Sequence, residues 1–142
     1  MKTVILSGFF NPLHGGHLDM IEGAALLGDR LVVIVNNDVQ QKIKKGKIIL
    51  AEQNRLRLIQ ALKGVDDAIL AVDQDPPVIE TIKICAEKYP SDELIFANGG
   101  DRDSDKVVPE ADICHELGIE MVYGVGKKIE SSSRINQALG LE

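Results

Sequence analysis

Two histidines three residues apart, His14 and His17, are the residues whose type and spacing most directly suggest chemistry in this chain. They lie in a glycine-rich turn between an apolar run, residues 4–6, and a segment of helical pattern from about residue 18 to residue 27. A helix that begins just after a strand presents unpaired N–H groups and the positive end of its dipole, and both attract anions. Because Gly16 adds no side chain between them, the two imidazoles and the backbone can face one phosphate chain. The pattern therefore indicates phosphate chemistry.

Two other interpretations of the histidine pair are a turn whose imidazoles are merely solvated and a pair of metal ligands. A metal site is poorly supported, because His115 is the only other histidine and the cysteines form no cluster. Two imidazoles that donate hydrogen bonds suit nucleotidyl transfer, in which charge develops on an α-phosphate and on the departing pyrophosphate. A phosphorylated acceptor brings its own nucleophile, so the protein supplies none. We expect His14 and His17 to be catalytic and expect no metal site built from protein side chains.

Composition limits the possible partners and the compartment. A chain of 142 residues is long enough for a single domain, residues 1–142, with a sizeable hydrophobic core. Its formal net charge of −6 argues against a nucleic-acid partner, which would need a broad basic face. No apolar run could cross a bilayer, no signal-peptide pattern is present, and Cys85 and Cys114 are expected to be reduced thiols inside helices. We therefore expect a cytoplasmic protein without a membrane partner.

Strand-like apolar runs alternate with helical patterns, which predicts an α/β domain. The expected strands are residues 3–7, 31–35, 68–72, 93–97 and 119–123, and the expected helices are residues 18–27, 51–63, 77–89, 109–117 and 131–139. The lysine-rich residues 40–47 are expected to be an irregular loop. We predict a Rossmann-like, doubly wound parallel five-stranded sheet with helices on both faces, whose ligands bind beyond the carboxyl ends of the strands. The dinucleotide and P-loop fingerprints are absent, so neither a standard NAD domain nor a P-loop enzyme is expected.

The segment His14-Gly15-Gly16-His17, placed after the first strand, resembles the HxGH signature of the nucleotidyltransferase superfamily that includes the cytidylyltransferases. The resemblance runs from residue 3 to about residue 139 and is nearest to glycerol-3-phosphate cytidylyltransferase and the heptose-phosphate adenylyltransferases. It implies that CTP or ATP, together with Mg²⁺, is used to transfer a nucleotidyl group to a small phosphorylated acceptor, such as a polyol or sugar phosphate, with release of pyrophosphate. It also implies a homodimer. The length and the lysine-rich segment favour CMP transfer, whereas Asn11-Pro12 and Gly99-Gly100-Asp101 are closer to the ATP-using branches.

The resemblance also assigns phosphate and acceptor contacts to the region after the second strand. Lys44 matches a lysine that clamps phosphates, and a second family lysine falls on Gly46, so Lys45 or Lys47 is an alternative. Asp38 and Arg55 are expected to bind the acceptor. For Arg55 the competing interpretation is an ion pair on the surface.

The expected nucleotide-binding residues lie in loops that follow strands, and they are Gly8, Phe9, Phe10, Asn11, Gly16, Gly99, Gly100, Asp101, Arg102, Lys127, Ser131 and Ser132. Asn11 stands where the family commonly has aspartate and is a candidate for an α-phosphate oxygen or the acceptor. The serines at residues 131–133 suit either a simple helix N-cap or a triphosphate site. Glu130 and Arg134 depart from the family's pattern there. A nucleotide-binding module without catalysis is therefore the alternative function, against which the intact histidine pair argues.

Overall fold

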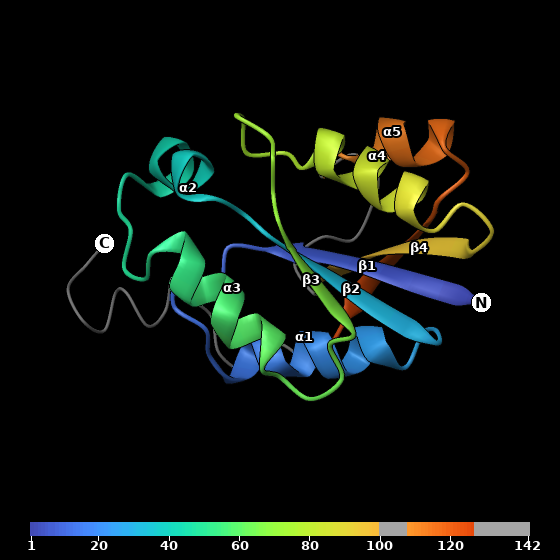
Figure 1. Ribbon diagram of the computed structural model, residues 1–142, viewed down its shortest axis with the longest axis horizontal. Helices are drawn as coiled ribbons and strands as arrows, with labels where there is room; N and C mark the ends of the chain where they lie inside the picture. The colour runs from blue at the N-terminus through green and yellow to red at the C-terminus, as the bar shows by residue number, and fades with distance from the viewer. Residues whose placement is uncertain (100–107, 127–142) are drawn as a thin grey trace.

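The sheet of this protein is parallel and has five strands in the order β3-β2-β1-β4-β5 (Figure 1). The computed structural model describes residues 1–99 and 108–126. The strands are β1 (Lys2–Gly8), β2 (Arg30–Val35), β3 (Asp67–Leu70), β4 (Glu93–Gly99) and β5 (Glu120–Val125). Their order reverses between β1 and β4, which is where doubly wound sheets bind ligands. The predicted Rossmann-like sheet is confirmed.

Helices cover both faces of this sheet, as predicted (Figure 1). They are α1 (Gly15–Ala25), α2 (Asp38–Lys45), α3 (Glu52–Gln60), α4 (Ile79–Lys88) and α5 (Ala111–Glu116). Ile21 of α1 and Ile59 of α3 belong to the buried cluster on one face, and Ile82 of α4 belongs to the cluster on the other. The expected helix at residues 131–139 lies outside the described residues.

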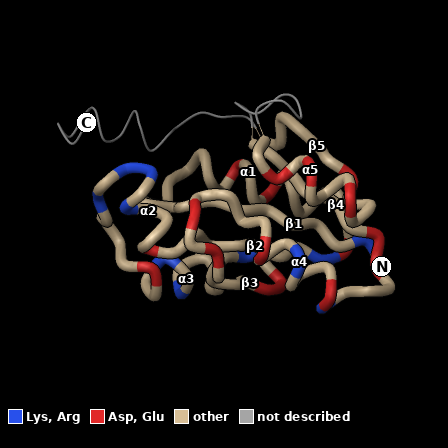
Figure 2. The backbone as a smooth tube through the Cα atoms, turned by 90° about the horizontal axis from the view of Figure 1, so that it is seen from above, with Lys and Arg blue, Asp and Glu red and all other residues tan. Residues whose placement is uncertain are grey.

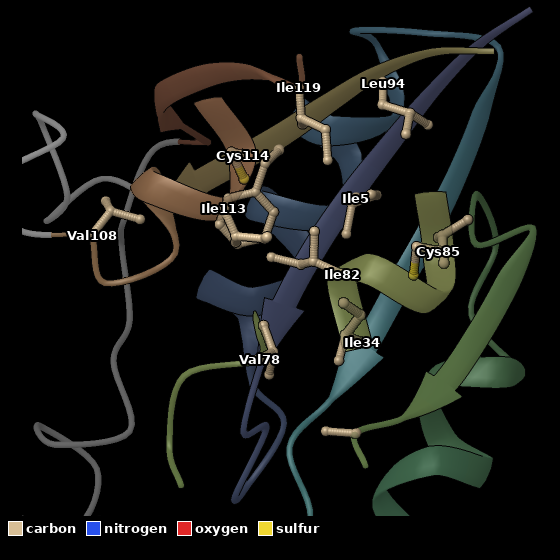
Figure 3. Packing of buried hydrophobic residues seen from close by; sticks show 13 residues of the cluster. Ile5, Ile34, Val78, Ile82, Cys85, Leu94, Val108, Ile113, Cys114 and Ile119 are labelled. Atoms are coloured by element: carbon tan, nitrogen blue, oxygen red, sulfur yellow. The ribbon is translucent and has the colours of Figure 1, made fainter. Parts of the chain in front are cut away.

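The core follows from the alternation of side chains along the central strands. In β1, Val4 and Leu6 belong to the cluster under α1 and α3, while Ile5 between them belongs to the cluster under α4 and α5. Figure 3 shows Ile82 of α4 and Ile113 of α5 directed toward Ile5. Such two-sided burial explains why these strands read as continuous apolar runs.

The two cysteines lie inside helices, as expected, Cys85 in α4 and Cys114 in α5, and both are buried thiols that form no disulfide. Burial raises the pKa of the Cys85 thiol to about 11, and the nearby Asp67 carboxylate adds to the rise. At neutral pH this thiol is therefore protonated and serves as a small core residue.

The expectation of an irregular loop at residues 40–47 is wrong, because most of this segment belongs to α2. The Asn37 side chain accepts a hydrogen bond from the Gln40 N–H, and the Gln40 side chain accepts one from the Asn37 N–H, each 2.9 Å long. This capping box begins the helix, and Gly46 ends it with a φ of 73°. Figure 2 shows the lysines of α2 as a basic end of the molecule. Periodicity failed to predict the helix because its two apolar residues, Val39 and Ile43, face solvent.

Asp67 is the first residue of β3, the outermost strand on one side of the sheet. Its carboxylate accepts hydrogen bonds from the Lys88 ammonium and the Tyr89 hydroxyl. Partial burial raises the pKa of the Asp67 carboxyl, but these hydrogen bonds and the Lys88 charge outweigh it and hold the pKa below its ordinary value of 3.8. The same contact raises the pKa of Lys88. The group therefore stabilises the fold electrostatically at neutral pH.

We expect Asp67→Asn to lower the free energy of unfolding at pH 7 by up to about 1 kcal/mol, the usual upper limit for a half-exposed pair. Because the folded-state pKa of Asp67 is lowered, its contribution is complete above the unfolded-state value of about 3.9 and disappears as the pH falls through the folded-state value. Urea unfolding of both proteins from pH 7 down to about pH 2 checks this. A difference that stays constant across this range would contradict the electrostatic assignment.

Candidate active site

The turn with the two histidines connects β1 to α1 at the carboxyl edge of the sheet, where the strand order reverses. His14 is the N-cap of α1, and its Nδ1 accepts a hydrogen bond of 3.1 Å from the Gly16 N–H. His17, three residues later, accepts a hydrogen bond of 3.2 Å at its own Nδ1 from the His14 N–H. The pair thus forms a capping box in which both side chains are imidazoles. The same two residues that begin the helix therefore define the site.

This capping geometry fixes the tautomer of both rings. A nitrogen that accepts a hydrogen bond carries no proton, so in each neutral imidazole the proton lies on Nε2. The rings of His14 and His17 stack with centroids 3.8 Å apart and planes inclined by 24°. Two N–H donors are thereby held close together at the positive end of a helix. Such a pair can donate to neighbouring oxygens of one phosphate chain.

Phe10 supports His17 within the protein, in contrast to the nucleotide contact expected for it. Its ring is 1% exposed and meets the His17 ring edge-on, with centroids 5.0 Å apart. The ring also fills the space beside Gly8, where a Cβ atom would lie 2.7 Å from Phe10 Cζ. Phe10 has a φ of 53°, a left-handed conformation that non-glycine residues seldom adopt. Gly8 thus leaves room for the Phe10 ring beneath the histidine turn.

Arg55 does not form an ion pair on the surface, because its side chain is wholly buried. Its Nη1 donates to the carbonyls of Phe9 (2.7 Å) and Asn36 (2.6 Å), and its Nε donates to the Leu50 carbonyl (2.8 Å). Its Nη2 donates to the Asp38 carboxylate at 2.7 Å. Through these contacts Arg55 and Asp38 hold protein segments together, and their expected contact with the acceptor stays a prediction.

Asn11, for which a contact with an α-phosphate oxygen or the acceptor is expected, makes hydrogen bonds within the protein. Its Oδ1 accepts hydrogen bonds from the N–H groups of Ile49 (2.9 Å) and Leu50 (2.8 Å), and its Nδ2 donates to the Lys47 carbonyl at 3.4 Å. The side chain is 6% exposed. Asn11 therefore joins the histidine turn to residues 47–50, the segment that leads from α2 into α3.

The lysine-rich helix lies beside the histidine turn, as topology suggested. Lys44 Nζ lies 4.8 Å from the centroid of the Phe9 ring, within the range of a cation–π interaction. Lys45 and Lys47, the alternatives for a second phosphate contact, are exposed. The structure thus brings Lys44, Phe9 and the histidine pair into one region.

Two glycines expected at the nucleotide are used inside the protein. The N–H of Gly16 is bonded to His14. At Gly99, the last residue of β4, a Cβ atom would lie 2.5 Å from Met20 Sδ of α1, so the missing side chain lets α1 pack against the sheet. The other expected nucleotide contacts, Gly100, Asp101, Arg102, Lys127, Ser131 and Ser132, lie outside the described residues.

Sequence reasoning missed a buried amide network that follows β2. Gln40 is fully buried, and its side chain bonds to Asn36, to Asn37 and to the Asp75 carbonyl. Asn37 in turn donates to the carbonyls of Ala71 and Asp73. The signal that could have found it is the spacing Asn-x-x-Gln directly after a buried strand, which is a capping pattern.

Sequence comparison shows which known proteins this chain is similar to. The family model described as "Cytidylyltransferase-like" matches residues 5–135. The chain is 45% identical over 75 residues to an FAD synthase of Ferroglobus placidus, and these residues are 53% of this chain and 49% of that protein. It is 32% identical over 139 residues to the bifunctional protein HldE of Desulfatibacillum aliphaticivorans, which is 96% of this chain but 26% of that protein. The chain thus spans half or less of these relatives.

Solved structures show the same likeness. A lipopolysaccharide core biosynthesis protein of Thermoplasma volcanium is 34% identical, with a TM-score of 0.69, over 92% of this chain and 99% of that one. A structure described as a putative nicotinate-nucleotide adenylyltransferase of Vibrio parahaemolyticus is 18% identical, with a TM-score of 0.61, over 97% of this chain and 86% of that one, and shows the fold alone. Among the described residues, no helix is long and apolar enough to cross a membrane. The match over residues 5–135 shows that this chain belongs to the cytidylyltransferase-like family, within the nucleotidyltransferase superfamily.

Proposed function

We propose that this protein transfers a nucleotidyl group from a nucleoside triphosphate to the phosphate of a small acceptor and releases pyrophosphate. The observation that carries the proposal is the pair of stacked imidazoles whose Nδ1 atoms accept backbone hydrogen bonds at the start of α1, which assigns the ring proton of each neutral imidazole to Nε2. Donors fixed before the substrate arrives stabilise developing charge without reorganisation during the reaction.

In the proposed reaction, an acceptor phosphate oxygen forms a bond to the α-phosphorus while the bond from that phosphorus to the bridging oxygen of pyrophosphate breaks. His14 and His17 donate hydrogen bonds to the oxygens on which charge develops, and Lys44 holds the phosphates from the side of α2. Ser131, Ser132 and Lys127 are proposed for the triphosphate, and Gly100, Asp101 and Arg102 for the nucleoside side. Arg55 joins the histidine turn to the start of α2, and Asn11 joins that turn to the segment after α2. We propose that both act as positioning residues.

Mg²⁺ is proposed to arrive with the triphosphate and to neutralise part of its charge. No group of three or more His, Cys, Asp or Glu side chains within residues 1–99 and 108–126 could hold a metal ion. Mg²⁺ usually keeps several waters and is bound through substrate phosphates and one or two carboxylates.

For the nucleotide, the relatives favour ATP. FAD consists of AMP joined to the phosphate of flavin mononucleotide, so the 45% identity to an FAD synthase supports AMP transfer to a phosphorylated acceptor. The family description and the lysine-rich segment support CTP instead. We propose ATP as the first donor to test and CTP as the second, with sugar, polyol or flavin phosphates as acceptors and a homodimer in the cytoplasm as the working form.

The test is thermal unfolding with Mg²⁺ and either ATP or CTP, followed by pyrophosphate release with each acceptor phosphate. A nucleotide at about a hundred times its Kd adds roughly 2.7 kcal/mol to the free energy of unfolding. We expect one of the two nucleotides to raise the midpoint and one acceptor to trigger pyrophosphate release. Stabilisation without release in the presence of any acceptor would instead support the non-catalytic module, and no stabilisation by either nucleotide would contradict nucleotide binding.

A further inference from the structure

Two polar side chains at the carboxyl ends of β4 and β5 contain buried atoms without a hydrogen-bond partner in the described part of the chain, and neither has a role above. They are the Oδ1 of Asn98 and the hydroxyl of Tyr123. Asn98 is 2% exposed and is the next-to-last residue of β4. Buried polar atoms without partners are rare in folded proteins and usually mark a bound water, an ion or a ligand.

These two side chains are neighbours in the sheet and share one face. Asn98 Nδ2 donates to the Val122 carbonyl at 3.2 Å, and Tyr123 is the next residue of β5. Phe96, two residues before Asn98, belongs to the cluster beneath α4 and α5, and Tyr123 packs against the same cluster. Ala97 and Gly99, on either side of Asn98, face α1, because Ala97 belongs to the cluster under α1 and a Cβ atom at Gly99 would meet Met20. Asn98 between them therefore lies on the face that Tyr123 occupies, although the pairing of β4 with β5 is irregular here.

The orientation of the Asn98 amide is fixed by its surroundings. Nδ2 also donates to the Phe96 carbonyl at 3.3 Å, so both of its N–H groups point at carbonyl oxygens. An inverted amide would place Oδ1 against those two oxygens, which is unfavourable. What remains is an acceptor only, at Oδ1. The hydroxyl of Tyr123, on the neighbouring strand β5, can donate or accept.

We propose that Asn98 Oδ1 and the Tyr123 hydroxyl read the base of the nucleotide, an inference that rests on the proposed function. An acceptor beside a hydroxyl complements an exocyclic amine beside an unprotonated ring nitrogen. Adenine and cytosine both present that edge. Guanine and uracil present a carbonyl and a ring N–H instead, so the carbonyl would face Oδ1, acceptor against acceptor.

The experiment measures Kd by titration calorimetry for ATP, for inosine triphosphate and for 1-deaza-ATP, each with Mg²⁺. Inosine triphosphate replaces the amine by a carbonyl, and 1-deaza-ATP replaces the ring nitrogen N1 by C–H. We expect wild type to prefer ATP over each analogue by about tenfold, the effect of one lost hydrogen bond. Tyr123→Phe should bind ATP about tenfold more weakly and should lose the preference for ATP over 1-deaza-ATP. If only CTP binds, CTP, UTP and 3-deaza-CTP replace this set.

Tyr89→Phe is the matched control, because Tyr89 is the only other tyrosine and its hydroxyl donates to Asp67 at the opposite edge of the sheet. It should lower the thermal midpoint of the free protein and leave the nucleotide preferences unchanged. Tyr123→Phe should leave the midpoint of the free protein unchanged, because its hydroxyl has no partner to lose in the described structure.

Three results would overturn the inference while leaving the proposed function intact. The first is equal affinity of wild type for ATP and inosine triphosphate. The second is a preference of Tyr123→Phe for ATP over 1-deaza-ATP that equals that of wild type. The third is that Tyr123→Phe loses a preference for ATP over 2′-deoxy-ATP, which would place the hydroxyl at the ribose. A lower midpoint of free Tyr123→Phe with unchanged nucleotide affinity would assign the hydroxyl to buried water. Failure of wild type to bind either ATP or CTP would instead count against the proposed function.

Discussion

Replacing His17 with asparagine is expected to lower kcat for pyrophosphate release by about 10²–10³-fold, the usual effect of removing one donor that stabilises developing charge. Asparagine is chosen because its amide oxygen can occupy the position of Nδ1 and accept the hydrogen bond of the His14 N–H. The N-terminus of α1 then stays capped, while nothing occupies the position of the Nε2–H donor. The measurement is steady-state release of pyrophosphate with saturating nucleotide and acceptor, together with the thermal midpoint of the free protein.

Two comparisons make this result specific. His17→Ala loses both the cap and the donor, so it should lose activity to the same degree and also lose about 1 kcal/mol of stability. His115→Asn alters an exposed histidine of α5 and should retain wild-type activity. Wild-type kcat in His17→Asn would contradict the donor role, and a midpoint as low as that of His17→Ala would show that the asparagine does not cap the helix.

The sequence predicted the elements whose signals are local. The central strands are buried on both faces, so they appear as apolar runs and were recognised within a residue or two of their ends. The histidine turn was predicted at the correct place for the same reason, since strand, turn and helix follow directly in the chain. The helix α2 was not predicted, because its apolar residues face solvent and only its capping residues, Asn37 and Gly46, mark its ends.

The roles of individual side chains were harder to predict, because they depend on contacts between distant segments. The sequence did not show that the side chains of Phe10 and Met20 fill the space beside Gly8 and Gly99, two glycines for which nucleotide contacts are expected. Asn11 bonds to residues 36 to 39 positions later in the chain. No spacing rule shows whether a polar group after a strand faces a ligand or another loop. The tautomer of the histidines likewise became apparent only from the capping contacts.

Arg55 gives the sharpest case. Its replacement by methionine is expected to lower the free energy of unfolding by about 3–5 kcal/mol, because three backbone carbonyls around its buried side chain lose their donor at about 1–3 kcal/mol each. The loss would leave the carbonyls of Phe9, Asn36 and Leu50 without their donor, as well as the Asp38 carboxylate. Lysine is not expected to rescue stability, because one ammonium cannot reproduce the planar fork that reaches these four acceptors. Urea unfolding of wild type, Arg55→Met and Arg55→Lys measures both effects.

Arg57→Met is the matched control, since Arg57 lies two residues later in α3 and is exposed, so its replacement should change stability by less than about 0.5 kcal/mol. If Arg55 instead bound the acceptor directly, the opposite effect on stability would be expected for Arg55→Lys. A lysine could still attract a phosphate, so stability would stay near wild type and the change would appear in the acceptor KM. If Arg55 positions the histidine turn through Phe9, the folded fraction of Arg55→Lys should show a lower kcat with an acceptor KM close to that of wild type, because the displaced part is the catalytic turn and not the acceptor's binding surface.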